Sequence, residues 1–213
     1  MKEITEKMLA ELRERVRSEM SEARFAHTLA VEEMTVRLCA LFCPEHTQKM
    51  RAAAILHDLT KEVRPAGQIA LCEELGLAVS NFDRSSPKTF HARTAAARIV
   101  RDFEEFDDPM IVNAVRRHTT GCAEMGLTDE LLYLADYIDE SRTYEFCVAL
   151  RRMFWDAKPE KMDEEERMNH LRTILLRSFD VTISDLISEG KTVAIDTLMA
   201  RNALLLQQMR ISN

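Results

Sequence analysis

The pair His57-Asp58, which follows the apolar run 52–56, is the part of this sequence best suited to chemistry. Neutral imidazole and ionised carboxylate are good ligands for a divalent cation, and both are costly to bury without a partner. Other groups of the same two kinds precede and follow the pair: His27, His91, His118 and Asp136. Four of the chain's six histidines fall in this ordered series. A metal-dependent phosphohydrolase is therefore the leading hypothesis.

The spacing suggests how these groups would share metal ions. His57 and Asp58 differ by about 100° around a helix, so both can converge on one ion at the helix edge. We expect His27 and Asp136 to complete this first site with four ligands.

A second ion is expected between His91 and His118, with Asp58 bridging the two ions. Imidazole and carboxylate together suit Fe, Mn, Co or Zn better than Mg or Ca. We expect one or two such ions per chain, with iron first and Mn, Co or Zn as the alternatives. Taken singly, each residue also has a structural interpretation: His27 as a partly buried histidine, His118 as a helix cap, and Asp136 as an acceptor in the core.

Hydrolysis also needs groups that orient water and bind phosphate. Asp58 or Asp136 could orient the attacking water by accepting a hydrogen bond. Lys61 lies four residues after His57 on the same face and is predicted to contact phosphate, although pairing with Glu62 is the alternative.

Five further residues are weaker candidates for substrate contacts. Arg24 could reach a phosphate or pair with an acid, and Arg142 follows the expected Asp136 helix. Thr119, Thr120 and Gly121 could offer hydroxyl and backbone N–H groups to phosphate, or form the turn that ends a helix.

The composition restricts the other possibilities. Hydrophobic residues make up 46% of the 213, Gly and Pro number only five each, and helix-forming residues are abundant, so we expect an all-α domain. The net charge of -7 and the lack of a basic tract disfavour binding to duplex nucleic acid. The charged N-terminus and the absence of an apolar run of roughly 20 residues predict a cytoplasmic protein without membrane segments.

Apolar periodicity, caps and breakers divide the chain into helices, with no convincing strand. The helices are expected at 5–19, 22–42, 46–63, 65–75, 87–100, 109–118, 128–138, 144–156, 163–189 and 196–209. The five cysteines contain no C-x-x-C pair, so Cys39 and Cys43 are predicted to be reduced thiols of the core.

Several stretches resemble one known group of proteins. His27, His57-Asp58 and Asp136 resemble the defining pattern of the HD-domain phosphohydrolase superfamily. More narrowly, the sequence is similar to the bacterial YqeK family over about residues 20 to 206. The stretches that carry this similarity are Arg24–Thr28, Ala53–Glu62, Asn113–Gly121, Tyr133–Asp139 and Asp196–Asn202.

The resemblance implies a single HD-type helical bundle over residues 1–213, with a core at about 20–142 and additional C-terminal helices at about 143–213. It implies symmetrical hydrolysis of dinucleoside tetraphosphates, such as diadenosine tetraphosphate, into two nucleoside diphosphates. The alternatives are an HD-type nucleotidase or pyrophosphatase acting on another nucleotide, and a nucleotide-binding regulatory module with little turnover. The oligomeric state stays open, a homodimer included.

The sequence departs from the family's pattern at three places. Ala92-Arg93 follows His91 where the family tends to have Gly-Pro, and Cys122 stands where arginine is frequent. The segment 142–170 matches poorly. These departures affect the residues expected to contact substrate more than the residues expected to bind metal.

Overall fold

The computed structural model describes residues 3–81 and 83–211, and these form α-helices joined by short 3₁₀ turns, without a strand among them. The all-α prediction is confirmed. The helices are α1 (Glu6–Arg17), α2 (Glu22–Phe42), α3 (Thr47–Leu56), α4 (Pro65–Glu74), α5 (Phe90–Asp102), α6 (Pro109–Arg117), α7 (Leu127–Ile138), α8 (Glu145–Asp156), α9 (Glu164–Ser188) and α10 (Ile195–Ile211).

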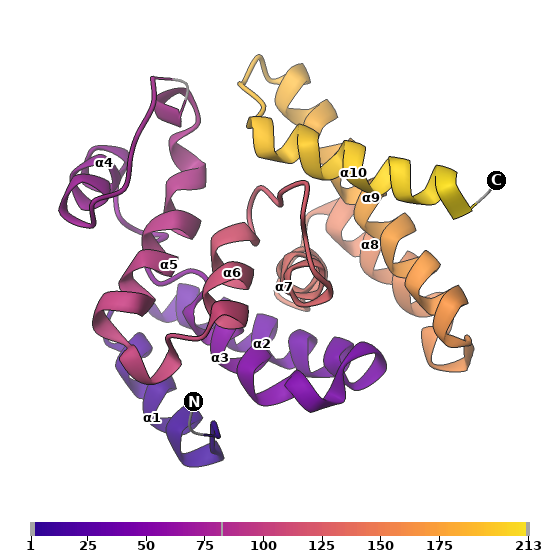
Figure 1. Cartoon of the computed structure of the whole chain (residues 1–213), viewed down its shortest axis with the longest axis horizontal. Helices are drawn as coiled ribbons and strands as arrows, with labels where there is room; N and C mark the ends of the chain where they lie inside the picture. Colours follow the sequence, from indigo (N-terminus) through magenta and orange to yellow (C-terminus); the bar gives the residue numbers. More distant parts are fainter. Residues whose placement is uncertain (1–2, 82, 212–213) are drawn as a thin grey trace.

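Helix α7 holds the bundle together. Figure 1 shows α7 end-on near the centre, with α5 and α6 on one side and α8 to α10 on the other. Its residues 131–135 are fully buried, because neighbouring helices cover it on nearly every side. A helix that is apolar around most of its circumference is stable only in such a central position.

One apolar core extends from α1 to α10. Cys39 and Cys43 lie in it, and all five cysteines are free thiols, as predicted. Arg201 donates to the Asp180 carboxylate at 2.8 Å and ties α10 to α9, which agrees with a structural role for this arginine.

The expected helix at 46–63 was too long at its C-terminal end. The helix ends at Leu56, and residues 57–62 continue as turns whose N–H groups reach back three residues, for example from Lys61 to the Asp58 carbonyl at 3.0 Å. The Nδ1 atom of His57 lies 2.6 Å from the Ala54 carbonyl, which the Asp58 N–H would use in a longer helix. The His57 side chain thus occupies the carbonyl acceptor that the next helical turn would need.

Two expected helix starts also differ. Residues Pro87–Thr89 form a 3₁₀ turn, and α5 begins only at Phe90. Helix α7 begins at Leu127, one residue before the expected start, and the Asp129 carboxylate accepts the N–H of the preceding Gly126 at 2.9 Å. Side-chain capping of this kind satisfies an N–H group that has no partner within the helix.

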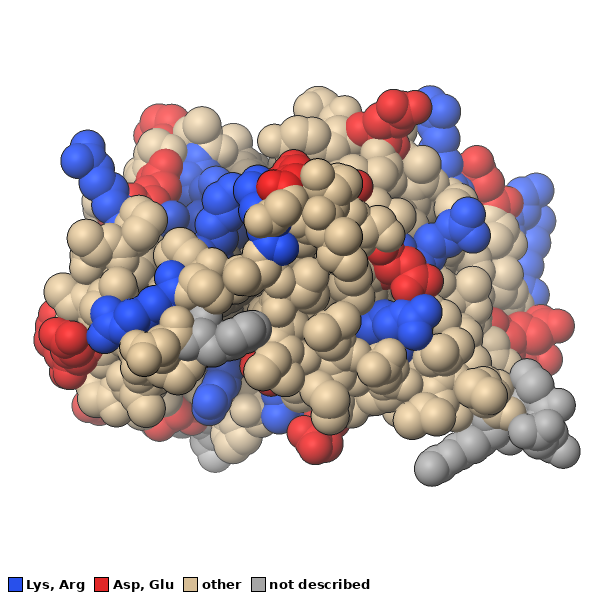
Figure 2. Space-filling view, turned by 90° about the horizontal axis from the view of Figure 1, so that it is seen from above, with Lys and Arg blue, Asp and Glu red and all other residues tan. Residues whose placement is uncertain are grey.

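On the face shown in Figure 2, Lys and Arg groups are interspersed with Asp and Glu groups and form no continuous basic band over the described residues. None of the described helices is both long and apolar enough to cross a membrane.

Glu130 gives a prediction about stability. This residue of α7 is only 3% exposed, and burial raises the pKa of its carboxyl to about 7 against the pull of Arg172. Because the folded-state pKa is raised, stability is highest at low pH and is lost as pH rises from about 4.5 to about 7. We expect Glu130→Gln to be no more stable than wild type near pH 4.5, but more stable near pH 8 by up to about 3 kcal/mol.

Urea unfolding followed by circular dichroism at the two pH values measures this difference. The exposed Glu124→Gln is a suitable control. Asp129→Asn is not suitable, because the Asp129 side chain caps the same helix. An equal stability difference at both pH values for Glu130→Gln would contradict the buried, protonated state.

Candidate metal centre

Four histidines converge in the core, and each has its Nδ1 atom held by a neighbour. In three of them Nδ1 lies beside the carbonyl three residues earlier: His57 with Ala54 at 2.6 Å, His91 with Lys88 at 2.7 Å, and His118 with Val115 at 2.6 Å. A carbonyl can only accept, so Nδ1 carries the proton in each ring. The Nε2 lone pairs are thereby left free to act as ligands.

The local chain geometry explains this arrangement. His57 and His118 follow the last residues of α3 and α6, and the carbonyls of a last helical turn have no partner within the helix. The imidazole rings of His57 and His118 donate hydrogen bonds to carbonyls of this last turn. A histidine directly after a helix is therefore both a cap and a ligand with a fixed ring orientation.

A first group of ligand atoms lies around the Oδ2 atom of Asp58. His27 Nε2 is 3.0 Å from Asp136 Oδ1 and 3.9 Å from Asp58 Oδ2. His57 Nε2 is 3.5 Å from Asp58 Oδ2 and 3.9 Å from Asp136 Oδ1. These four atoms come from α2, the turn after α3 and α7, and they are the four residues expected at the first site.

A second group lies around the other oxygen of the same carboxylate. Asp58 Oδ1 is 3.3 Å from His91 Nε2 and 3.5 Å from His118 Nε2, and the two Nε2 atoms are 3.1 Å apart. The structure thus brings together all six expected ligands, with the two oxygens of Asp58 pointing into different groups. Within the described residues, the two sets close enough to hold an ion are His27, His57 and Asp136, and His57, Asp58 and His118.

The donor atoms fit a divalent cation. The Nε2 lone pairs of His91 and His118 face each other at 3.1 Å, and in the metal-free protein the Lys61 ammonium beside His91 offsets their repulsion. Three buried atoms of the cluster have no hydrogen-bond partner among the described residues: His27 Nε2, His57 Nε2 and Asp58 Oδ1. Buried polar atoms are rarely left unpaired, and a metal ion would satisfy all three.

The pKa shifts in the cluster favour, for most of its groups, the protonation state that can bind a metal ion. Burial raises the pKa of Asp58, but His57, His118 and Lys61 more than offset it and hold the pKa well below its usual value. Burial likewise raises the pKa of Asp136, while Arg142, His27 and His57 bring it well below the usual value. Both carboxylates are therefore ionised.

Among the histidines, burial lowers the pKa of His91 well below 6.5 and that of His118 below 6.5, so both rings are neutral. Burial also lowers the pKa of His27, but hydrogen bonds to Asp136 and Asp139 raise it to about 9. His27 thus carries a proton in the metal-free protein. A cation bound by His27 and Asp136 would replace that proton.

Three positive side chains border the cluster. Arg24 donates to Asp58 Oδ2 at 2.7 Å, and Arg142 pairs with Asp136 and donates to its backbone carbonyl at 2.8 Å. Lys61 Nζ lies 3.0 Å from His91 Nε2 and 3.7 Å from Asp58 Oδ1. Glu62, the alternative partner of Lys61, instead accepts hydrogen bonds from Ser21. Lys61 and Arg142 line the cavity, where they could also contact a substrate anion.

The expected Thr119–Gly121 group is divided between two cavities. The Thr119 hydroxyl lies 2.9 Å from His91 Nε2 and 3.0 Å from His118 Nε2, and Thr119 lines the cavity at the cluster. Thr120 and Gly121 line a different cavity of about 610 Å³. Gly121 has φ +65°, and a Cβ there would lie 2.8 Å from Phe179 and Ala200, so this glycine serves the turn and the packing of α9 and α10.

The sequence interpretation missed Asp139 and Ser141. The Ser141 hydroxyl donates to Asp139 Oδ1 and lies 3.0 Å from His27 Nδ1, so the pair fixes the His27 ring from behind. Asp139 is fully buried. Its position three residues after Asp136 on the same helical face was the available signal. Groups that orient metal-binding histidines in this way typically change metal affinity when they are removed.

The remaining histidines lie outside the cluster. His46 is partly exposed beside Glu45, and His170 Nε2 lies 3.0 Å from the Phe154 carbonyl. They are useful as controls.

The sequence matches the HD domain family over residues 24–141, which include all six candidate ligands. The chain belongs to the HD domain family. This family membership confirms the resemblance stated from the sequence. The division into a core and a C-terminal extension stays a prediction.

Several relatives are similar over nearly their whole length. The symmetrical bis(5'-nucleosyl)-tetraphosphatase of Halalkalibacterium halodurans is 28% identical over 193 residues, which cover 91% of this chain and 95% of the relative. The protein of the same name from Bacillus subtilis is 26% identical over 190 residues, covering 89% and 94%. A crystal structure from Clostridium acetobutylicum, described as a predicted HD superfamily hydrolase involved in NAD metabolism, has a TM-score of 0.80 and 27% identity, covering 93% of this chain and 97% of that one.

Loss of one ligand tests the centre directly. We expect the protein, purified without chelator, to contain about one or two transition-metal ions per chain. His57→Ala removes a ligand atom near both groups and should abolish metal retention, while His46→Ala should retain it. Elemental analysis gives the metal content, and circular dichroism checks that each variant is folded. Full metal content in folded His57→Ala would contradict the assignment.

Proposed function

We propose that this protein is a metal-dependent hydrolase that splits dinucleoside tetraphosphates symmetrically into two nucleoside diphosphates. The observation that carries the proposal is the buried cluster of four imidazoles and two carboxylates at one end of a cavity of about 940 Å³. The names of the relatives, which match across nine tenths of the chain, support this substrate class.

The reaction needs an activated water and a stabilised phosphate. A bound divalent ion lowers the pKa of a water ligand and polarises a phosphate oxygen. Six residues of this chain would hold the metal: His27, His57, Asp58, His91, His118 and Asp136. Their mixed nitrogen and oxygen donors suit iron, with Mn, Co or Zn as alternatives, in one or two ions.

Asp58 and Asp136 are ionised and buried, so each can accept a hydrogen bond from the attacking water and orient it. The water attacks one of the two central phosphorus atoms, and the bond from this phosphorus to the central bridging oxygen breaks. Each product is then a nucleoside diphosphate.

The positive groups bind the polyphosphate chain. Lys61 and Arg142 line the cavity together with Lys88 and Lys191, and Arg24 contacts Asp58 from the other side. They offset the negative charge that four phosphates bring to a chain of net charge -7. Thr119 adds a hydroxyl at the cluster end, whereas a role for Thr120 and Gly121 would require substrate to reach the neighbouring cavity.

Product analysis tests the reaction. Diadenosine tetraphosphate incubated with metal-loaded protein should give ADP as the sole nucleotide product, with one ¹⁸O atom per cleavage in H₂¹⁸O. Chromatography and mass spectrometry measure both. AMP with ATP would show asymmetrical cleavage, and no turnover with any dinucleoside polyphosphate would leave a binding module instead.

Lys61→Ala separates substrate binding from metal binding. Because the ammonium group lies 3.0 Å from His91 but is not needed as a ligand, metal content should stay as in wild type. Loss of this positive charge should slow turnover by about 100-fold. Lys7→Ala, on the exposed face of α1, is the control. Metal loss in Lys61→Ala would make the lysine a structural partner of the cluster.

A further inference from the structure

The cavity at the cluster has two chemically different walls. One end holds His118 and Asp136, with Arg142 paired to Asp136 and Lys61 near Asp58. The other wall carries the aromatic and aliphatic side chains Tyr137, Tyr144, Phe146, Val181 and Leu186, beside the acidic Glu145, Asp185 and Glu189. An occupant with a charged chain and a flat apolar end would match both walls.

All three tyrosines of the chain belong to one run of ring contacts. Buried Tyr133 stacks on Phe179 at 4.5 Å and on Tyr137 at 5.1 Å between ring centres. Tyr137 is followed by Phe146 at 6.1 Å, and Phe146 by Tyr144 at 6.4 Å with ring planes 21° apart. The run thus leads from the core to the edge of the cavity, with its inner rings fixed by packing.

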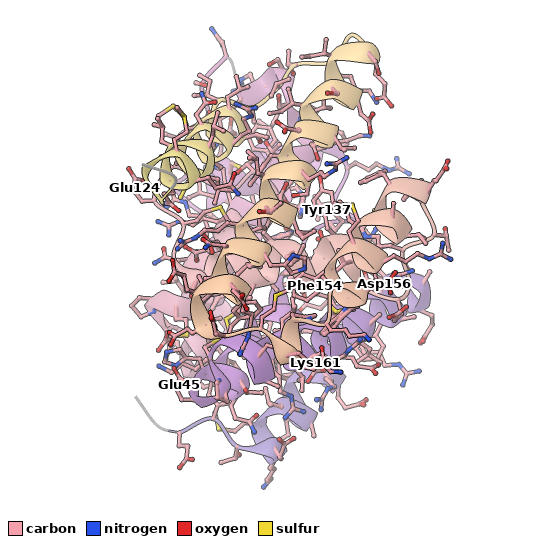
Figure 3. All side chains as sticks on the ribbon, turned by 90° about the vertical axis from the view of Figure 1, so that its right-hand side faces the viewer. Glu45, Glu124, Tyr137, Phe154, Asp156 and Lys161 are labelled. Atoms are coloured by element: carbon pink, nitrogen blue, oxygen red, sulfur yellow. The ribbon has the colours of Figure 1, made fainter. Side chains whose placement is uncertain are left out.

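Tyr137 connects the two sides of this wall. Its hydroxyl bonds to Thr182 of α9 at 2.6 Å, and its ring faces Phe146 of α8. Figure 3 shows Tyr137 between the ribbons of α8 and α9. The base of the wall is therefore rigid.

Tyr144 differs from the other rings because it is 66% exposed. It precedes the first residue of α8 and follows Arg142, which pairs with Asp136, by only two residues. Two residues span at most about 7 Å of backbone, and both Arg142 and Tyr144 line the cavity. An exposed aromatic face at this distance is suited to stacking.

We propose that Tyr144, supported by Phe146, forms the stacking platform for one nucleobase of the substrate. This inference rests on the proposed function and assigns it a base-binding residue. Stacking uses the π-face that every base has, so the platform would accept different bases.

Binding of two probes to the metal-loaded protein tests the platform: ADP, which has a base, and inorganic pyrophosphate, which has none. A stacked ring is worth about 1–3 kcal/mol per base, so Tyr144→Ala should weaken ADP binding about tenfold or more. Pyrophosphate binding should stay within twofold, and Tyr144→Phe should bind both probes like wild type. Isothermal titration calorimetry measures all these affinities.

Met153→Ala is the matched control, because Met153 is an exposed apolar residue of the same helix, 40% exposed, and does not line the cavity. Wild-type ADP affinity in Tyr144→Ala would overturn the proposal. An equal loss of ADP and pyrophosphate binding would also overturn it, because the ring would then support the cavity rather than the base.

The experiments distinguish failure of the proposed reaction from failure of the proposed stacking platform. If wild type binds ADP through Tyr144 but cleaves no dinucleoside tetraphosphate, the proposed reaction is wrong and the platform stands. If wild type cleaves the substrate symmetrically and Tyr144→Ala binds ADP normally, only the platform is wrong.

Discussion

The hydrogen bond between a histidine Nδ1–H group and a carbonyl three residues earlier is the interaction on which this site depends. It occurs at His57, His91 and His118. At His57 and His118 the bond uses a carbonyl from the last turn of a helix, so the backbone itself orients the ring. The same contact fixes the tautomer and directs Nε2 toward the shared centre. Helix termination and ligand geometry thus have one cause, and a small movement of α3 or α6 would displace a ligand.

The buried charges impose a second constraint. Asp58 and Asp136 are ionised in the core, where an unpaired carboxylate costs several kcal/mol. In the metal-free protein Arg24, Arg142 and protonated His27 supply the opposite charge. These pairs keep the carboxylates ionised and separated from bulk water. A divalent ion therefore enters a site whose anions are already in position and displaces a proton rather than assembling the site from scattered groups.

The sequence predicted the helices and the ligand types because both depend on local information. Apolar periodicity marks the helices, and the order of His27, His57-Asp58, His91, His118 and Asp136 marks the candidate ligands. The end of α3 at Leu56 was missed, since periodicity continues past it while the His57 side chain takes the carbonyl of Ala54. The support of His27 by Asp139 and Ser141 and the position of Gly121 against Phe179 and Ala200 were missed for another reason. Both depend on contacts between residues far apart in the sequence. The spacing of Asp139 from Asp136 was the one local signal, and it does not point to His27.

Helix α7 joins two functions that lie on different parts of the chain. Asp136 points toward the histidines, and the next residue, Tyr137, faces α8 and α9. Residues 24–141 supply the whole cluster, whereas residues 142–191 supply most of the apolar wall of the cavity. Because few side chains serve both, the wall can change without disturbing the donor atoms. Selection among substrates is therefore expected to reside in the helices that follow α7.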